Sequence, residues 1–292
     1  MSALSFVLVL VGWSQVSPGA KDDEPGVAAR TAEFQAAVAE KRIDAAEALV
    51  PKLAGKFAEL ERIIGAKGAP QPPSREAIAA AQRDRKIVLD GIERVVKDSR
   101  VAARLQTKIL RQFGVLPGEG EKLALRAIKL RHIDEVPESL AAAAGALGTH
   151  RKPEYIETFE KLLNDTRVEV LKAAAGAMGE YFAEKEPVRK RIVGSMILAY
   201  QSAGSGFGPS GSEGGGQRTL VDHELRMLVR HDFQRALARL TGGVHFDSAE
   251  KWADWYRENK SSPWRDGLDH VSIKLDGLQP GPAPGHRDPG NH

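Results

Sequence analysis

The chain has 292 residues, of which 42% are apolar, 6% aromatic and 28% charged, and this length suffices to bury a substantial core. Its 42 basic and 39 acidic residues nearly balance, so the formal charge does not require a polyanionic partner. It has no cysteine, which excludes disulfides, thiolate metal ligands and thiol nucleophiles. Alternating β-branched runs are almost absent, which favours an all-α fold.

Residues 1–20 predict a signal peptide. An apolar run at residues 4–13 is followed by small and polar residues up to Ala20, and the run is too short to span a bilayer, which needs about 20 apolar residues. No Lys or Arg precedes the run, and the alternative interpretation is a buried first helix. We expect an exported, periplasmic or extracellular protein without a transmembrane span in the mature chain.

Residues 21–64 predict an N-terminal helical hairpin, because apolar residues recur at spacings of three and four. Pro51 lies inside the second apolar stripe, so the second helix is expected to start or to kink there. A Gly- and Pro-rich linker follows at residues 65–74. Residues 75–113 then predict a helical pair, with Ser74 as the cap of its first helix. Whether these hairpins continue the repeats that follow is left open by the sequence.

An internal repeat indicates the architecture of the next part. Residues 138–148 read ESLAAAAGALG, and residues 169–179 read EVLKAAAGAMG, 31 residues later; Asp134 and Asp165 align at the same offset. Self-similarity at a fixed period is typical of repeat proteins, in which each unit buries its apolar face by stacking on its neighbours.

Each unit predicts two packed helices joined by a polar turn. One apolar face consists of Tyr155, Ile156, Phe159, Leu162 and Leu163, and the facing stripe consists of Val170, Leu171, Ala174, Ala177 and Met178. Asp165 in the turn is placed to cap the second helix. We expect the small residues Ala173, Ala175 and Gly176 to let neighbouring helices approach closely.

Residues 162–179 resemble the HEAT-repeat family, including its short bacterial version called PBS-lyase HEAT-like. The resemblance rests on paired leucines, a turn Asp and a second helix with a Val, paired Ala residues and a final apolar-Gly pair, carried here by Leu162, Leu163, Asp165, Val170, Ala173, Ala174, Ala177, Met178 and Gly179. One departure is Leu171, where the family usually carries an Arg. The resemblance implies an α-solenoid of antiparallel helical hairpins over residues 119–260.

The last unit is degenerate and is interrupted by a Gly-rich insertion at residues 201–218, which lacks the spacing of a phosphate-binding loop. Its second helix is expected to bury Leu225, Leu228, Val229, Ala236, Leu237 and Leu240. The segment after it, with Trp252 and Trp255, resembles the end of exported bacterial HEAT-like proteins. We interpret the Trp pair as a hydrophobic cap, the alternative being a platform for a ligand or sugar. Residues 261–292 predict a disordered tail.

No catalytic, cofactor-binding or metal-binding residue is predicted. His223 and His231 lie about 12 Å apart along one helix, too far to share an ion, and His245 with Asp247 matches no metal-ligand spacing. Ser195 lies in a helical stripe rather than in a nucleophile elbow. Glu154, Glu157 and Glu160 are interpreted as a solvated helix face.

The most basic stretch carries Arg226, Arg230, Arg235 and Arg239, but these do not share one helix face, so binding of nucleic acid is not expected. We therefore expect a non-enzymatic scaffold that binds another protein through the concave face of the solenoid. The alternatives are an enzyme-associated or lyase-like HEAT module and a binder of an anionic polymer.

Overall fold

The computed structural model describes residues 26–203 and 215–268. The predicted signal peptide, most of the Gly-rich insertion and the chain after Leu268 lie outside these residues. In the described part the chain is helical and has no strand, which confirms the all-α prediction.

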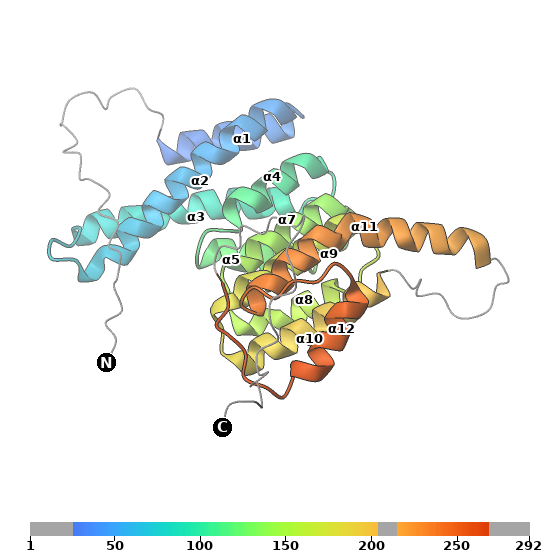
Figure 1. The fold of residues 1–292 in the computed structure, drawn as a ribbon. Helices are drawn as coiled ribbons and strands as arrows, with labels where there is room; N and C mark the ends of the chain where they lie inside the picture. Colours follow the sequence, from blue (N-terminus) through green and yellow to red (C-terminus); the bar gives the residue numbers. More distant parts are fainter. Residues whose placement is uncertain (1–25, 204–214, 269–292) are drawn as a thin grey trace.

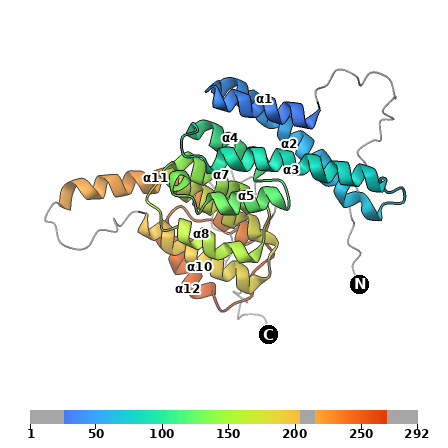
Figure 2. The same ribbon diagram turned by 180° about the vertical axis from the view of Figure 1, so that it is seen from behind.

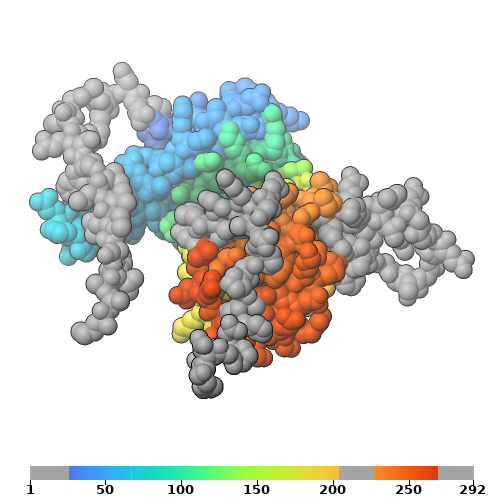
Figure 3. All heavy atoms as spheres, in the orientation of Figure 1, coloured from blue at the N-terminus to red at the C-terminus, as the bar shows by residue number. Residues whose placement is uncertain are grey.

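Three helices form the N-terminal end of the molecule and pack on one another: α1 (Val27–Ala39), α2 (Ile43–Gly65) and α3 (Arg75–Lys97). Helix α2 runs through Pro51 as one helix, so it does not start at the proline. Ser74 caps α3 as predicted, because its hydroxyl accepts a hydrogen bond from the Ala77 N–H at 3.1 Å. In the space-filling view these helices lie at the opposite end of the molecule from the orange and red C-terminal helices (Figure 3).

The remaining helices lie in two layers (Figures 1 and 2). The first layer contains α4 (Ala103–Phe113), α7 (Pro137–Gly148), α9 (Val168–Gly179) and α11 (Gly215–Leu240), each packed against the next. The second contains α5 (Glu119–Ala127), α8 (Ile156–Leu162) and α10 (Glu186–Ser202), which pack on α7, α9 and α11 respectively. Helix α2 packs on α4, so the N-terminal helices are in contact with the first layer.

Short helices complete the chain: α6 (Arg131–Asp134) lies against α7, and α12 (Ala249–Asn259) packs on α10. Two 3-10 turns, Pro153–Tyr155 and Glu180–Ala183, follow α7 and α9. The buried side chains form two clusters that meet along α7, where Ala142 and Ala143 belong to the N-terminal cluster and Ala144 and Leu147 to the C-terminal one.

Close packing in the first layer depends on glycines at the ends of α4, α7 and α9. A Cβ on Gly148 would lie 2.5 Å from the Cβ of Ala177, and a Cβ on Gly179 would lie 2.9 Å from that of Ala236. Gly114, which follows α4, faces Ala146 in the same way at 2.7 Å. Since real Cβ atoms do not come this close, successive helices pack at these distances only because glycine occupies these positions.

Polar contacts join positions about one repeat apart. His132 Nε2 donates to the Val96 carbonyl at 2.8 Å, and His150 Nε2 donates to the Gly114 carbonyl at 2.7 Å, each across 36 residues. Arg191 pairs with Glu160, 31 residues away, at 2.6 Å. These contacts join α3 to α6, the residue after α4 to the turn after α7, and α8 to α10.

The turn residue Asp165 does not cap α9, contrary to the prediction. The helix starts further on, after Arg167, and has no side-chain cap. Asp165 instead accepts hydrogen bonds from the backbone and side chain of Arg167 at 2.8 Å, and Arg167 also reaches Asp134 at 3.0 Å. Arg167 thereby joins the aligned aspartates of two successive units, while Leu171 is buried.

The packed chain extends past Ser261, where the tail was predicted to begin. Trp264 is buried, and its indole N–H donates to the Asn259 carbonyl at 3.0 Å. The buried Arg189 donates to the carbonyls of Leu240 and Arg265 at 2.6 and 2.8 Å. Aromatic and hydrogen-bonding contacts therefore hold residues up to Leu268 against α10 and α11, although the proline content of this region predicts a tail.

Candidate functional site

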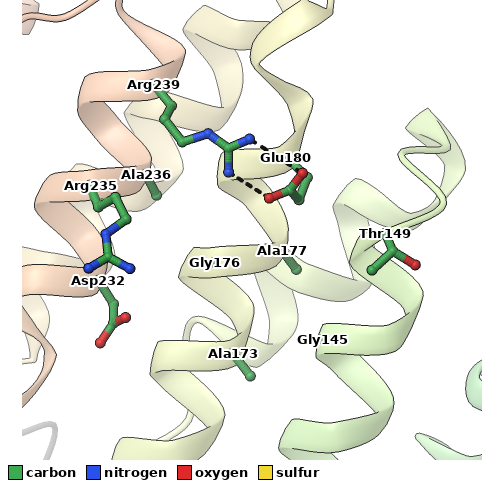
Figure 4. Close-up of a pocket in the computed structure, with 10 residues that line it drawn as sticks. All are labelled: Gly145, Thr149, Ala173, Gly176, Ala177, Glu180, Asp232, Arg235, Ala236 and Arg239. Atoms are coloured by element: carbon green, nitrogen blue, oxygen red, sulfur yellow. Dashed lines mark hydrogen bonds and ion pairs between the residues drawn. The ribbon is translucent and has the colours of Figure 1, made fainter. Parts of the chain in front are cut away.

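A groove of about 320 Å³ lies across three helices of the first layer (Figure 4). Helix α7 contributes Gly145 and the following turn Thr149, and α9 contributes its small residues and the adjacent Glu180. Helix α11 forms the opposite wall. The full lining consists of Gly145, Thr149, Ala173, Gly176, Ala177, Glu180, Asp232, Arg235, Ala236 and Arg239.

The floor of this groove is made by glycines that no described helix packs against. Gly145 and Gly176 are 31 residues apart and occupy equivalent positions in the two repeats. A Cβ on either would meet no atom within 4 Å, and both residues are exposed. The expectation that Gly176 permits close helix approach is therefore wrong: Gly179 and Gly148 serve that purpose, and Gly176 faces open space.

An ion-pair cluster forms one end of the groove. Arg239 donates to Glu180 at 2.5 Å, and Arg151 pairs with the same carboxylate at 3.0 Å. The two guanidinium groups also lie over the ring of Phe182, 4.8 and 5.0 Å from its centroid. Burial raises the pKa of Glu180, but hydrogen bonds from Arg239 outweigh it, so the pKa lies below its ordinary value. The cluster is charged and held in place at neutral pH.

One side of helix α11 carries a mixed apolar and charged stripe, whose three charged residues line the groove. Leu228, Asp232, Arg235 and Arg239 follow one another at spacings of four and three, so they share a helix side. Leu228 is 52% exposed, which contradicts its prediction as a core residue. Asp232 lies 3.6 Å from Lys172 of α9. The stripe therefore offers an exposed leucine and a fixed pattern of charges.

A second hollow of about 570 Å³ lies between α2, α4 and the start of α7. Its basic residues are Arg104, Lys108 and Arg111, and Arg104 pairs with Glu47 at 3.1 Å. Its lining also includes Glu138, seven residues before Gly145, and this spacing puts both on one side of α7. Both hollows therefore lie on one side of the first layer, and we call this side the groove face.

The predicted Trp pair lies away from the groove face. Trp252 is fully buried and Trp255 is 6% exposed. Their rings pack against each other at 5.9 Å, and Trp255 packs on Trp264 at 5.2 Å. Buried rings are not available for stacking on a ligand, so the platform alternative is wrong for these two residues.

The histidines and the arginines of α11 do not come together in one site. His231 is exposed, whereas His245 is buried, and burial lowers the pKa of His245. Among the described residues no three metal-ligating side chains come together. Arg235 lines the groove while Arg230 lies on another face, near His245 and Asp247, as helical geometry predicts. The side chains of His223 and Arg226 lie outside the description.

Ser195 and the helix-surface carboxylates have structural partners or face solvent. The Ser195 hydroxyl donates to Glu160 at 2.9 Å. Glu160 also pairs with Arg191, so it belongs to a contact between α8 and α10 rather than to a solvated face. Glu154 and Glu157 are exposed, as predicted.

Comparison with known proteins adds no assignment. No protein-family model, no curated protein and no solved structure matches the chain. Within the described residues, no helix is both long enough and apolar enough to cross a membrane.

Proposed function

We propose that the chain is a HEAT-like α-solenoid and a non-enzymatic scaffold, which binds another protein through the groove face. This face would be the concave side of the solenoid. The arrangement is supported by the order of packing from α4 through α7 and α9 to α11, and by the polar contacts between positions about one repeat apart. Export through the N-terminal apolar segment remains part of the proposal.

The observation that carries the binding role is the pair of open glycines. Glycine within a helix costs about 0.5–1 kcal/mol relative to alanine, because the unfolded chain loses more freedom. At Gly148 and Gly179 this cost is offset by close packing, but Gly145 and Gly176 have no neighbour within 4 Å. Both repeats therefore carry a destabilising glycine at the same position, and no neighbouring helix requires it. This repetition indicates that the open groove has a function.

The chemistry of the groove fits a peptide surface better than a small substrate. Its floor consists of Gly145, Ala173 and Gly176, which leave room for side chains of a partner, and its walls carry Arg235 and the Glu180–Arg239 pair. Leu228 extends the apolar surface along α11. Apolar contact surrounded by charged groups is typical of protein interfaces.

A pull-down from the envelope fraction of the native organism tests this function. Gly176→Leu places an apolar side chain in the groove at a position where an added Cβ meets no atom within 4 Å. Gly55→Leu is the matched control, because Gly55 is also helical, exposed and without an atom within 4 Å of its Cβ position, but lies in α2 outside the groove lining. We expect a protein retained by the wild type and by Gly55→Leu to be lost with Gly176→Leu. Equal retention by all three would contradict binding in the groove.

The second candidate is a binder of anionic polymers, which is favoured by the three basic side chains of the hollow beside α4. Glu47 and Glu138 in the same lining reduce its positive charge. Such binding would weaken steeply with salt, whereas retention of a protein partner by apolar contact would not.

A further inference from the structure

We infer that the groove between α7, α9 and α11 binds an acidic segment of the partner, and that Arg235 pairs with a carboxylate of this segment. The inference rests on the proposed function and names the chemistry of the partner. Its test distinguishes a groove that binds another kind of peptide from a groove that binds none, so the two proposals can fail separately.

The carboxylates of the groove are already paired. Its charged lining consists of Glu180, Asp232, Arg235 and Arg239. Glu180 accepts a hydrogen bond from Arg239 at 2.5 Å and pairs with Arg151 at 3.0 Å, while Asp232 lies 3.6 Å from Lys172. Arg151 and Lys172 lie outside the lining, so each carboxylate has a basic partner beyond the groove. With these partners counted, four basic groups accompany two acidic ones, and the groove attracts negative charge.

Arg235 is the basic residue that this pairing leaves available. In the described part of the chain it pairs with no carboxylate, and its side chain is exposed on the wall formed by α11 (Figure 4). Arg239, one turn further along α11, is held by Glu180 and by the ring of Phe182. A guanidinium group is a planar fork that binds a carboxylate through two parallel hydrogen bonds. Arg235 therefore offers such a fork to a partner.

The floor beside Arg235 gives room for a short segment. Its residues Gly145, Ala173, Gly176 and Ala177 carry at most a methyl group, and a Cβ on either glycine would meet no atom of the described chain within 4 Å. The groove volume of about 320 Å³ equals that of about ten water molecules in the liquid. A few residues of a projecting peptide fit this space, whereas the surface of a folded domain does not enter it.

The same lining disfavours a polyanion. Nucleic acids and other polyanions bind through several basic groups, each of which neutralises a phosphate. Here Asp232 and Glu180 share the lining with Arg235, and they repel a closely spaced row of phosphates more strongly than a single carboxylate. An isolated Asp or Glu among small or apolar residues matches this pattern.

A library of random linear peptides displayed on phage provides a defined probe. Peptides are selected on the full-length chain, and those that also bind Gly176→Leu are discarded, because that variant places a leucine side chain in the groove. We expect the retained peptides to contain Asp or Glu more often, and Lys or Arg less often, than the unselected library. Retained peptides without this enrichment would overturn the inference and leave groove binding intact, whereas recovery of none would overturn both proposals.

One retained peptide is then synthesised with a fluorescent label, and its dissociation constant is measured by anisotropy. We expect Arg235→Glu to weaken binding about tenfold or more, because a charge-assisted hydrogen bond is lost. Arg111→Glu is the matched control, since Arg111 is also exposed and lines the other hollow of the groove face, on α4. Binding to this control should equal binding to the wild type.

A charge exchange completes the test. When the acidic residue of the peptide is replaced by arginine, the peptide should bind Arg235→Glu more tightly than the wild type, a result that a misfolded variant would not give. Unchanged binding of the original peptide to Arg235→Glu would overturn the inference. An equal loss in Arg111→Glu would also overturn it, since the attraction would then come from the overall charge of the groove face.

Discussion

The two sides of α7 and α9 use the same residue for opposite purposes. On the packed side, Gly148 and Gly179 lie so close to Ala177 and Ala236 that a Cβ would overlap with them. On the groove side, Gly145 and Gly176 face open space. The two glycines of each pair are 31 residues apart, so the repeat period alone does not distinguish the packed pair from the open pair. The position of the neighbouring helix decides whether a glycine permits close packing or leaves open space.

The largest effect is expected on the packed side. In Gly148→Ala the new methyl group would lie 2.5 Å from the Ala177 Cβ and 2.7 Å from its Cα, so α7 and α9 must separate. Overpacking of this kind costs about 1–3 kcal/mol. Gly179→Ala, with 2.9 Å to the Ala236 Cβ, should cost less. Urea unfolding followed by circular dichroism measures both, and wild-type stability in Gly148→Ala would show that the layer is less tightly packed than described.

The groove side should respond with the opposite sign. Gly145→Ala and Gly176→Ala place a methyl group in open space, so each should stabilise the protein by about 0.5–1 kcal/mol through the lower entropy of the unfolded chain. The same urea titration checks this. A loss of stability in either variant would contradict the open space described at these two positions.

The smallest effect is expected at low pH, on the stability that the contact between Asp165 and Arg167 contributes. Burial raises the pKa of Asp165, but the hydrogen bonds from Arg167 outweigh it, so its pKa is lowered in the folded chain. Its contribution to stability is therefore fully present above the unfolded pKa of about 3.9 and is lost as the pH falls through the lower folded value.

Asp165→Asn removes this contribution at every pH. Its free energy of unfolding should therefore lie below that of the wild type by a constant amount above about pH 5, and the two curves should approach each other below about pH 4. Parallel curves down to about pH 2 would show that Asp165 does not titrate in this way.

Periodicity predicted the helices well, because the apolar spacing along a helix is set by burial of one face. The predicted apolar stripe of α9 is buried throughout, and so are Tyr155, Ile156, Phe159 and Leu163 of the predicted face before it. Ser74 was identified as a cap from its position alone. These features depend on local sequence, which a single chain displays directly.

The features that the sequence did not predict depend on neighbours. Helix α9 carries small residues on both sides, so Gly176 and Gly179 could not be told apart without knowing where α11 lies. Leu228 was assigned to the core by spacing, yet half of it stays exposed among the described helices. Trp264 lies in the segment whose proline content predicts a tail, while its burial depends on α10 and α12. The sequence does not predict the groove for the same reason. The groove lies across three helices, and it is open because Gly145 and Gly176 have no side chain.

The most direct test of the central claim measures stability and partner retention in one protein, the double variant Gly145→Ala/Gly176→Ala. Two added methyl groups should raise its free energy of unfolding above that of the wild type, yet reduce the amount of partner that it retains in the envelope pull-down. A more stable protein that retains the wild-type amount of partner would contradict the claim that these glycines keep the groove open for binding.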